Sequence, residues 1–254
     1  TWGFAGEPVE QVETHAAHVF LAGDRAFKIK KPVHTAFLDF STPEARRVMC
    51  ETEVRLNRRL ADDVYLGVVP VTREADGRLR LSGSGPVVDW LVKMRRLPAD
   101  RMLDVLIREQ RLDKNVCQRI AARLAGFYQR ALPLLTFAEQ YRAQIETHVR
   151  ANLAELRRPE HGLPAELVTR VHAAQLLLLQ AATELFDERV CDGRIVEGHG
   201  DLRPEHICVL PVPVVFDCLE FSSELRCVDI ADELSFLAME CDLLGAAELG
   251  QCVF

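Results

Sequence analysis

The sequence predicts an α+β protein in which a small, mainly antiparallel sheet is followed by a larger group of helices. Three observations support this class. Five segments in the first third alternate apolar and polar residues or are rich in β-branched and aromatic ones, as strands are. A single helical segment interrupts them. Beyond Arg95 the apolar residues recur with the spacing of amphipathic helices.

The five predicted strands have the sequences HVFLAG (18–23), RAFKIKK (25–31), VYLGVVPVT (64–72), RLRLS (78–82) and VVDWLVKM (87–94). Turn signals such as AGD, EADG and SGSGP lie between them. Short strands joined by such turns favour antiparallel pairing, so these segments are expected to form one small sheet.

The interrupting helix is predicted over residues 41–60, STPEARRVMCETEVRLNRRL. Ser41 stands three residues before Glu44, which is the spacing of a capping box, and Pro43 suits the first helical turn. The later helices are predicted over residues 99–112, 115–132, 137–158, 164–190 and 229–245. A connector near residues 89–97 separates the two parts, which predicts a sheet-rich domain at 1–92 and a helical domain at 93–254.

Composition narrows the classes of function. Of 254 residues, 48% are hydrophobic and 27% charged, as in a soluble globular protein, and the net charge of −7 argues against a general nucleic-acid binder. The same charge is compatible with a cationic small substrate. The eight cysteines form no CxxC pair and several lie in apolar runs, which favours reduced thiols in a cytoplasmic protein. The longest apolar run is too short to span a bilayer, so no membrane association is expected.

One stretch carries the candidate chemistry: EGHGDLRPEHICV, residues 197–209. It places two carboxylates, two histidines and an arginine within nine positions beside an apolar run, which is costly unless something binds there. Phosphoryl transfer needs a carboxylate to orient the acceptor, ligands for a metal ion and cations on the phosphate. In protein kinases the catalytic Asp precedes a metal-binding Asn by five residues, and here Asp201 precedes His206 by five. A second carboxylate, Asp217, ends the β-branched run VPVVFD.

The motif HGDLRPEH resembles the catalytic loop of the aminoglycoside phosphotransferase and choline kinase group, with scattered similarity from about Thr14 to Leu244. The segment EFSSELRCVDIADELSFLAMECD looks like that of an uncharacterised bacterial subgroup of this family. The resemblance implies a bilobal protein-kinase-like fold, a small antiparallel sheet lobe plus a larger helical lobe. It also implies that Asp201 is the base, that Arg203 steadies the γ-phosphate and that Asp217 binds the metal ion, with His206 as a further candidate ligand.

FLAGDRAFKIKKPV similarly resembles the strand-turn-strand that carries the nucleotide-binding lysine of this family. Lys28 and Lys30 alternate onto one face of that strand, and Lys28 is the preferred candidate. Glu53 is preferred over Glu51 as its carboxylate partner on the following helix. The chain departs from the family at His206, where kinases have Asn, and in lacking GxGxxG, since the first hairpin turn has only one glycine.

The resulting hypothesis is an ATP-dependent phosphotransferase with an alcohol-group acceptor, using ATP or GTP with Mg²⁺ or Mn²⁺. The nucleotide is expected against the connector, and the acceptor is expected to be an aminoglycoside-like, sugar or amino-alcohol hydroxyl. The alternative is a catalytically weak pseudokinase that senses nucleotides or binds a partner. A third hypothesis, an Fe(II) site formed by His199, Asp201 and His206, is weaker, because the oxygenases with such a site are β-barrels whose second histidine lies far along the chain, whereas His206 follows Asp201 by five residues in a helical part. Separately, His199 is expected to be a structural histidine.

Overall fold

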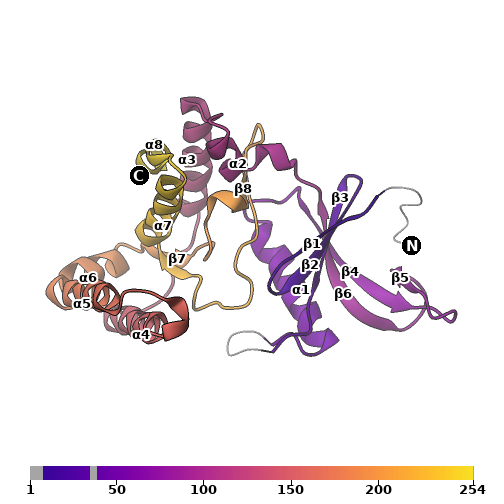
Figure 1. The fold of residues 1–254 in the computed structure, drawn as a ribbon, viewed down its shortest axis with the longest axis horizontal. Helices are drawn as coiled ribbons and strands as arrows, with labels where there is room; N and C mark the ends of the chain where they lie inside the picture. The colour runs from indigo at the N-terminus through magenta and orange to yellow at the C-terminus, as the bar shows by residue number, and fades with distance from the viewer. Residues whose placement is uncertain (1–7, 35–38, 254) are drawn as a thin grey trace. The chain divides into compact units, whose positions relative to one another are not determined.

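The computed structural model describes residues 8–34 and 39–253, and it combines a sheet-rich first third with a mostly helical remainder (Figure 1). The predicted α+β class is therefore confirmed. The sheet strands are β1 (Glu10–Glu13), β2 (Ala17–Ala22), β3 (Arg25–Lys30), β4 (Tyr65–Arg73), β5 (Leu79–Leu81) and β6 (Val87–Arg95).

These six strands lie in the order β1-β2-β3-β6-β4-β5, and every neighbouring pair is antiparallel. Five of them match the predicted segments. Strand β1 was not predicted, because its sequence EQVE holds one apolar residue and all four positions are exposed. It pairs only with β2, so it lies at the edge of the sheet, where no buried face imposes a hydrophobic pattern.

Successive side chains of β3 point to opposite faces of the sheet. Ala26 packs in a buried cluster with Cys50 and Val54 of helix α1 (Pro43–Asn57), whereas Phe27 packs in a second cluster that contains Leu91. Because the strand has a period of two, Lys28 and Lys30 share the face of Ala26 and point toward α1. The predicted alternation therefore places both lysines against helix α1.

Helix α1 begins one residue later than the capping-box spacing predicted. Its N-cap is Thr42, whose hydroxyl accepts a hydrogen bond from the backbone N–H of Ala45 at 3.1 Å. The Ser41 hydroxyl makes a different contact and donates to Asp39 at 2.6 Å. Glu44 also makes a different contact from that of a capping box, since its carboxylate accepts from the Arg47 guanidinium.

The predicted connector at residues 89–97 overlaps the strand predicted at 87–94, and the structure bears out the strand. Strand β6 runs through Arg95 because it is held on both sides, by β3 up to the Arg25–Arg95 pair and by β4. Only residues 96–98 lie between β6 and the next element, η1 (Ala99–Arg101). Residues 89–94 are therefore part of the sheet.

The other helices are α2 (Leu103–Arg108), α3 (Lys114–Tyr128), α4 (Ala138–Leu156), η2 (Pro159–His161), α5 (Ala165–Ala181), α6 (Thr183–Cys191), η3 (Pro204–His206), α7 (Ile230–Leu243) and α8 (Ala247–Val253). The predicted helix at 164–190 is two helices, because Ala182 leaves the helical region with φ −114° and ψ 39°. Good helix formers surround this break, so its position could not be found from residue preferences.

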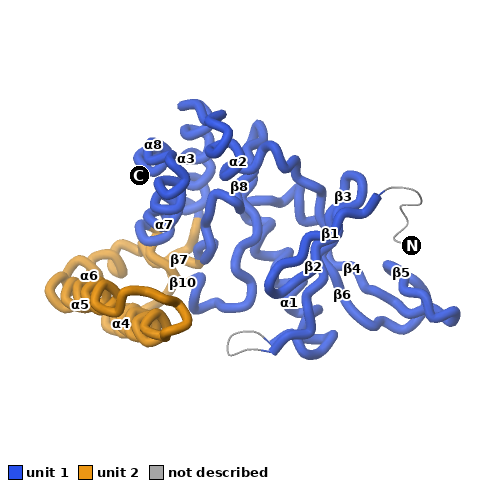
Figure 2. The backbone as a smooth tube through the Cα atoms, viewed as in Figure 1, with its two compact units in different colours: residues 1–130, 198–226, 231–254 blue, residues 131–197, 227–230 orange. Residues whose placement is uncertain are grey.

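Four short strands complete the fold. Strand β7 (Ile195–Glu197) pairs with β10 (Cys227–Asp229), and β8 (Ile207–Cys208) pairs with β9 (Val214–Val215), both antiparallel. The chain forms two compact units (Figure 2): unit 1 is residues 1–130, 198–226 and 231–254, and unit 2 is residues 131–197 and 227–230. The predicted lobes at 1–92 and 93–254 are a different division, and that boundary stays a prediction.

The eight cysteines are free thiols, of which Cys50, Cys117, Cys208, Cys218 and Cys241 are buried. Thiols of this kind fill core space as small apolar groups do. Across residues 8–34 and 39–253, no helix combines the length and the apolar character needed to cross a membrane.

Candidate active site

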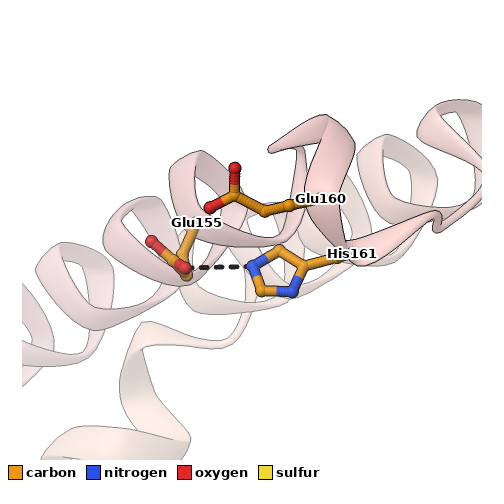
Figure 3. A group of neighbouring side chains, drawn as sticks. All are labelled: Glu155, Glu160 and His161. Atoms are coloured by element: carbon orange, nitrogen blue, oxygen red, sulfur yellow. Dashed lines mark hydrogen bonds and ion pairs between the residues drawn. The ribbon is translucent and has the colours of Figure 1, made fainter.

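Unit 2 contains a carboxylate–histidine group formed by Glu155, Glu160 and His161 (Figure 3). All three side chains are exposed, and His161 Nε2 lies 3.0 Å from a Glu155 oxygen. Arg158 forms ion pairs with both glutamates, so part of their charge is already compensated. Exposed pairs of this type are common on surfaces. The group therefore gives no support for a metal centre.

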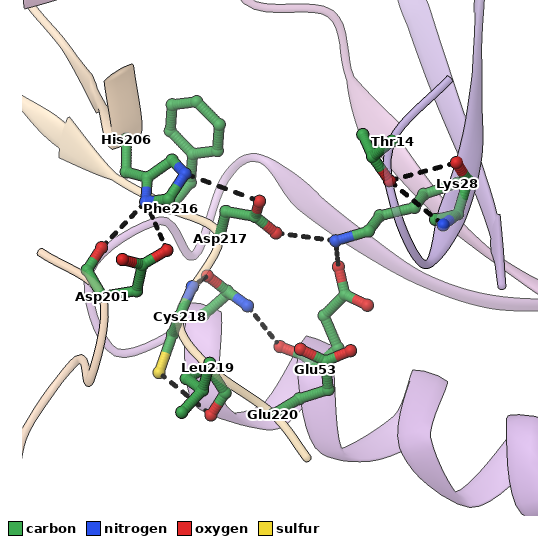
Figure 4. A network of polar contacts seen from close by, with 12 residues as sticks. Thr14, Lys28, Glu53, Asp201, His206, Phe216, Asp217, Cys218, Leu219 and Glu220 are labelled. Carbon is green, nitrogen blue, oxygen red and sulfur yellow. Dashed lines mark hydrogen bonds and ion pairs between the residues drawn. The ribbon is translucent and has the colours of Figure 1, made fainter. Parts of the chain in front are cut away.

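The other polar cluster lies in unit 1 and joins strand β3 to helix α1 (Figure 4). Glu53 of α1 is completely buried, and its two carboxylate oxygens meet two lysines of β3. Lys28 Nζ lies 3.0 Å from Oε1, and Lys30 Nζ lies 2.7 Å from Oε2. A buried carboxylate is stable only when paired, and this one is paired twice.

The two lysines have different second partners. Lys30 is 3% exposed, forms an ion pair with Glu220, and has its ammonium 5.2 Å from the centre of the Phe40 ring. Lys28 instead reaches Asp217, whose Oδ1 is 2.6 Å from Nζ. Lys30 is thus held between two carboxylates in the interior, whereas Lys28 is held beside the more exposed Asp217.

The pKa values of these groups follow from burial and charge together. Burial lowers the pKa of Lys28, but Asp217 and Glu53 outweigh it, so the net pKa is well above its ordinary value. Burial raises the pKa of Glu53, and the two lysines reverse this, so that the net pKa is lowered. Lys28 and Glu53 therefore stay charged at neutral pH. Glu51, the alternative partner, is exposed and pairs with Arg47 on the helix surface.

The 199–206 segment is fixed from two sides. Glu233 of α7 accepts hydrogen bonds from the backbone N–H groups of His199 and Gly200, at 3.0 and 2.5 Å. The Tyr128 hydroxyl donates to the same carboxylate. Gly200 has φ +84°, and a Cβ there would lie 3.0 Å from the Arg226 side chain, so glycine is required by both conformation and space. These contacts orient the loop that carries Asp201.

His199 is a structural histidine, as expected. Its Nε2 donates to the carbonyl oxygen of Phe216 at 2.9 Å, and its Nδ1 lies 3.4 Å from the Asp201 N–H. Burial lowers the pKa of His199 to about 3, so the ring is neutral. Because both ring nitrogens are engaged, the iron site proposed from His199, Asp201 and His206 does not form, and within the described ranges these side chains do not bring three ligand atoms together.

His206 lies between the two aspartates. Its Nδ1 is 2.8 Å from the backbone oxygen of Asp201, and a carbonyl oxygen can only accept, so Nδ1 carries the hydrogen. In its neutral form the ring has its lone pair on Nε2, which lies 3.7 Å from Asp217 Oδ2, whereas in its protonated form its charge faces both aspartates. The contact to Asp201 thus sets the tautomer and turns the free lone pair toward Asp217.

Asp201 is partly exposed, with 37% of its side chain accessible. Its Oδ2 lies 3.6 Å from His206 Nδ1. Burial raises the pKa of Asp201, and the opposing effects of His206 and Arg203 do not cancel this. A carboxylate with a raised pKa is a better proton acceptor than an ordinary surface Asp.

Arg203 is placed by two carboxylates. Its Nη2 lies 3.2 Å from Glu240 Oε2 of α7 and 3.4 Å from Glu205 Oε1. Among the residues that the structure describes, its buried Nε has no hydrogen-bond partner. The guanidinium therefore keeps an unused donor beside the loop of Asp201.

Asp217 has an unusual backbone. Its φ is +61°, a left-handed conformation that costs most residues about 1–2 kcal/mol. Burial raises the pKa of its carboxyl, but Lys28 and His206 outweigh burial, and the net pKa is lowered. The side chain is 40% accessible, with Oδ1 on Lys28 and Oδ2 toward His206.

The donors present fit a divalent cation. Two ligands bound to one Mg²⁺ at about 2.1 Å can lie at most about 4.2 Å apart. Asp217 Oδ2 and His206 Nε2, 3.7 Å apart, meet that limit, and His206 has the tautomer that a ligand needs. One carboxylate and one imidazole make a softer set than the all-oxygen shell that Mg²⁺ prefers.

The structure thus brings six of the seven predicted site residues into a connected network: Lys28, Lys30, Glu53, Asp201, His206 and Asp217. Arg203 lies beside it on Glu240. Sequence reasoning did not find Glu220, Glu233, Asn57 or Tyr65, which also hold the network. The only signal for Glu220 was its position three residues after Asp217.

Comparison with known proteins finds relatives among mycobacterial sequences. No model of a protein family matches the chain. Uncharacterised proteins of Mycobacterium bovis and of two Mycobacterium tuberculosis strains are 36% identical over 241 residues, which is 94% of this chain and 47% of theirs. The chain therefore spans about half the length of the curated relatives it matches.

A solved structure extends the comparison. The crystal structure of a choline/ethanolamine kinase family protein from Mesorhizobium loti matches with a TM-score of 0.53 and 15% identity, covering 99% of this chain and 69% of that one. At this identity the likeness concerns the fold, and it confirms the predicted protein-kinase-like fold.

Proposed function

We propose that this chain is an ATP-dependent phosphotransferase that moves the γ-phosphate to a hydroxyl of a small molecule. The observation that carries the proposal is the Lys28–Glu53–Asp217–His206–Asp201 network, assembled in unit 1 from segments far apart in the sequence. It supplies a cation, metal donors and a carboxylate base, which are the groups that phosphoryl transfer needs. The kinase-like fold supports the same reaction class.

In this proposal Lys28 binds phosphate oxygens of the nucleotide. Glu53 keeps its ammonium in place, because the helix carboxylate is itself anchored by Lys30. Asp217 and His206 would hold Mg²⁺ or Mn²⁺, which neutralises charge on the phosphates when bound. The lowered pKa of Asp217 keeps it ionised for this role.

Asp201 acts on the acceptor. It accepts a hydrogen bond from the substrate hydroxyl and takes its proton as the oxygen attacks the γ-phosphorus. The bond from the γ-phosphorus to the β,γ-bridging oxygen breaks, and ADP leaves. Arg203, held beside the loop of Asp201 by Glu240, would steady the transferred phosphate. The acceptor class is proposed to be an aminoglycoside-like molecule, a sugar or an amino alcohol.

A phosphotransfer screen tests this function. ATP and GTP, each with Mg²⁺ or Mn²⁺, are incubated with aminoglycosides, sugars and amino alcohols, and transfer of the γ-phosphate is followed by mass spectrometry. Transfer that disappears in Asp201→Asn and persists in the exposed control Asp62→Asn supports the proposal.

The alternative is a pseudokinase that binds nucleotide without efficient transfer. Two observations favour it: His206 replaces the amide of the kinase motif, and Arg203 is held by two carboxylates rather than left open. Nucleotide binding with no transfer to any acceptor, and no ATP hydrolysis that depends on Asp201, would select this alternative.

A further inference from the structure

The loop that carries Asp217 has no strand partner of its own. Residues 216–220 follow β9 without regular secondary structure, so their backbone N–H groups need acceptors elsewhere. Four consecutive N–H groups find them. Phe216 donates to the His206 carbonyl at 2.9 Å, and Leu219 donates to the His199 carbonyl at 3.0 Å. The two N–H groups between them are bound by side chains.

Those two side chains come from helix α1 and strand β4. The Asp217 N–H donates to the Tyr65 hydroxyl at 3.2 Å, and the Cys218 N–H donates to Asn57 Oδ1 at 2.9 Å. Tyr65 and Asn57 are each 1% exposed, so no water can replace them as acceptors without a rearrangement. Tyr65 begins β4, and Asn57 is the last residue of α1.

Each side chain is itself fixed. Asn57 Nδ2 donates to the carbonyl oxygen of Glu53 at 2.9 Å, one helical turn earlier. This contact also sets the orientation of the amide, because only the nitrogen can donate to a carbonyl. Burial raises the pKa of Tyr65 well above its ordinary value, and Glu53 and Asp217 raise it further, so the hydroxyl stays neutral.

We propose that Tyr65 and Asn57 are positioning residues that hold Asp217 in its left-handed conformation and so aim its carboxylate at the metal ion. The left-handed backbone is strained, and such a conformation persists only when its surroundings fix it. The two acceptors lie at and immediately after the strained residue. Because Asn57 and Glu53 share one face of α1, the same helix fixes both the partner of Lys28 and the loop of Asp217. This inference rests on the proposed function.

The test measures metal binding directly. Mn²⁺ is titrated into the protein saturated with a non-hydrolysable ATP analogue, and free Mn²⁺ is followed by electron paramagnetic resonance. A parallel titration measures the affinity of the analogue without metal. Tyr65→Phe removes the hydroxyl that accepts from the Asp217 N–H. Asn57→Ala removes the amide oxygen that accepts from the Cys218 N–H. Tyr141→Phe, at a buried tyrosine of α4 in unit 2, is the matched control.

Loss of a group that orients a metal ligand typically weakens metal binding by about 10–100-fold. We expect the Kd for Mn²⁺ to rise by about ten-fold in Tyr65→Phe, with the metal-free affinity of the analogue unchanged and Tyr141→Phe like wild type. A purely structural role would lower the melting temperature of Tyr65→Phe and leave its Kd for Mn²⁺ as in wild type, and that result overturns the inference. If Asn57→Ala does not fold, Tyr65→Phe alone decides. Absence of Mn²⁺ binding in wild type would contradict the proposed function instead.

Discussion

Lys28 and Asp217 are 189 positions apart in the sequence, yet the Lys28 ammonium lies 2.6 Å from an oxygen of the Asp217 carboxylate. The same ammonium lies 3.0 Å from Glu53. One cation thus joins strand β3, helix α1 and the loop after β9. Metal binding at Asp217 would supply the charge that Lys28 now supplies, which frees Lys28 for the phosphates of a nucleotide.

The two lysines of β3 are expected to respond differently to substitution. Lys30→Met leaves Glu53 and Glu220 without their shared buried cation, and breaking such a pair costs about 3–5 kcal/mol of unfolding free energy. Lys28→Met is less destabilising, because Glu53 keeps Lys30 and Asp217 is partly exposed. Urea unfolding measures both, with Lys31→Met as the control, because Lys31 is partly exposed and pairs with the exposed Glu13. Equal unfolding free energies for the Lys28 and Lys30 variants would contradict the assignment of Lys30 as the structural member.

Asp201→Asn is expected to abolish phosphotransfer and to stabilise the protein at neutral pH. The pKa of Asp201 is raised, so the folded state favours its protonated form, and that contribution is lost as pH rises through the folded pKa. An amide avoids the cost of a partly buried charge. The melting temperature of Asp201→Asn should exceed that of wild type at pH 7.5, and the difference should vanish below about pH 4, near the pKa of an unfolded Asp. A lower melting temperature at pH 7.5 would show that the carboxylate is stabilising.

His199 is expected to contribute to acid unfolding. Its pKa is about 3 in the folded protein and about 6.5 in an unfolded chain, so between these values only the unfolded state binds the proton. The stabilising contribution is complete above about pH 6.5 and falls by about 1.4 kcal/mol per pH unit on acidification. In His199→Gln this part of the pH dependence should be absent, whereas the exposed His15→Gln should behave as wild type. The same slope in His199→Gln and wild type would remove His199 from the account.

His206 is expected to set the metal preference. Mn²⁺ accepts an imidazole ligand more readily than Mg²⁺, which favours oxygen. Activity should be higher with Mn²⁺ than with Mg²⁺ at equal concentration, and His206→Asn should shift the preference toward Mg²⁺. Titrating both metals against both proteins measures this. An identical preference would mean that His206 only supports the loop through its contact with the Asp201 carbonyl.

Short-range periodicity in the sequence predicted the elements of the site, and the resemblance of HGDLRPEH and FLAGDRAFKIKKPV to kinase segments predicted its residues. The alternation of β3 predicted that Lys28 and Lys30 share a face, and helical spacing placed Glu53 on α1. Side chains that serve distant backbone leave no such pattern. Asn57 and Tyr65 contact residues 161 and 152 positions away, and nothing near them in the sequence marks that role.

Some element boundaries were not predicted from local patterns. The strand predicted over 87–94 matches β6 to within one residue, but strand β1 was not predicted, because all four of its positions are exposed. The helix predicted over 164–190 is interrupted at Ala182, where residue preferences give no signal.

The most direct test of the central claim is calorimetric titration of the wild-type chain with ATP, with and without Mg²⁺. The account predicts one nucleotide per chain, bound more tightly with Mg²⁺, and weakened by Lys28→Met but not by Lys31→Met. It also predicts that Asp217→Asn removes the Mg²⁺ dependence, because the metal carboxylate is lost. No binding of ATP by the wild-type chain at millimolar concentration, with or without Mg²⁺, would contradict the account.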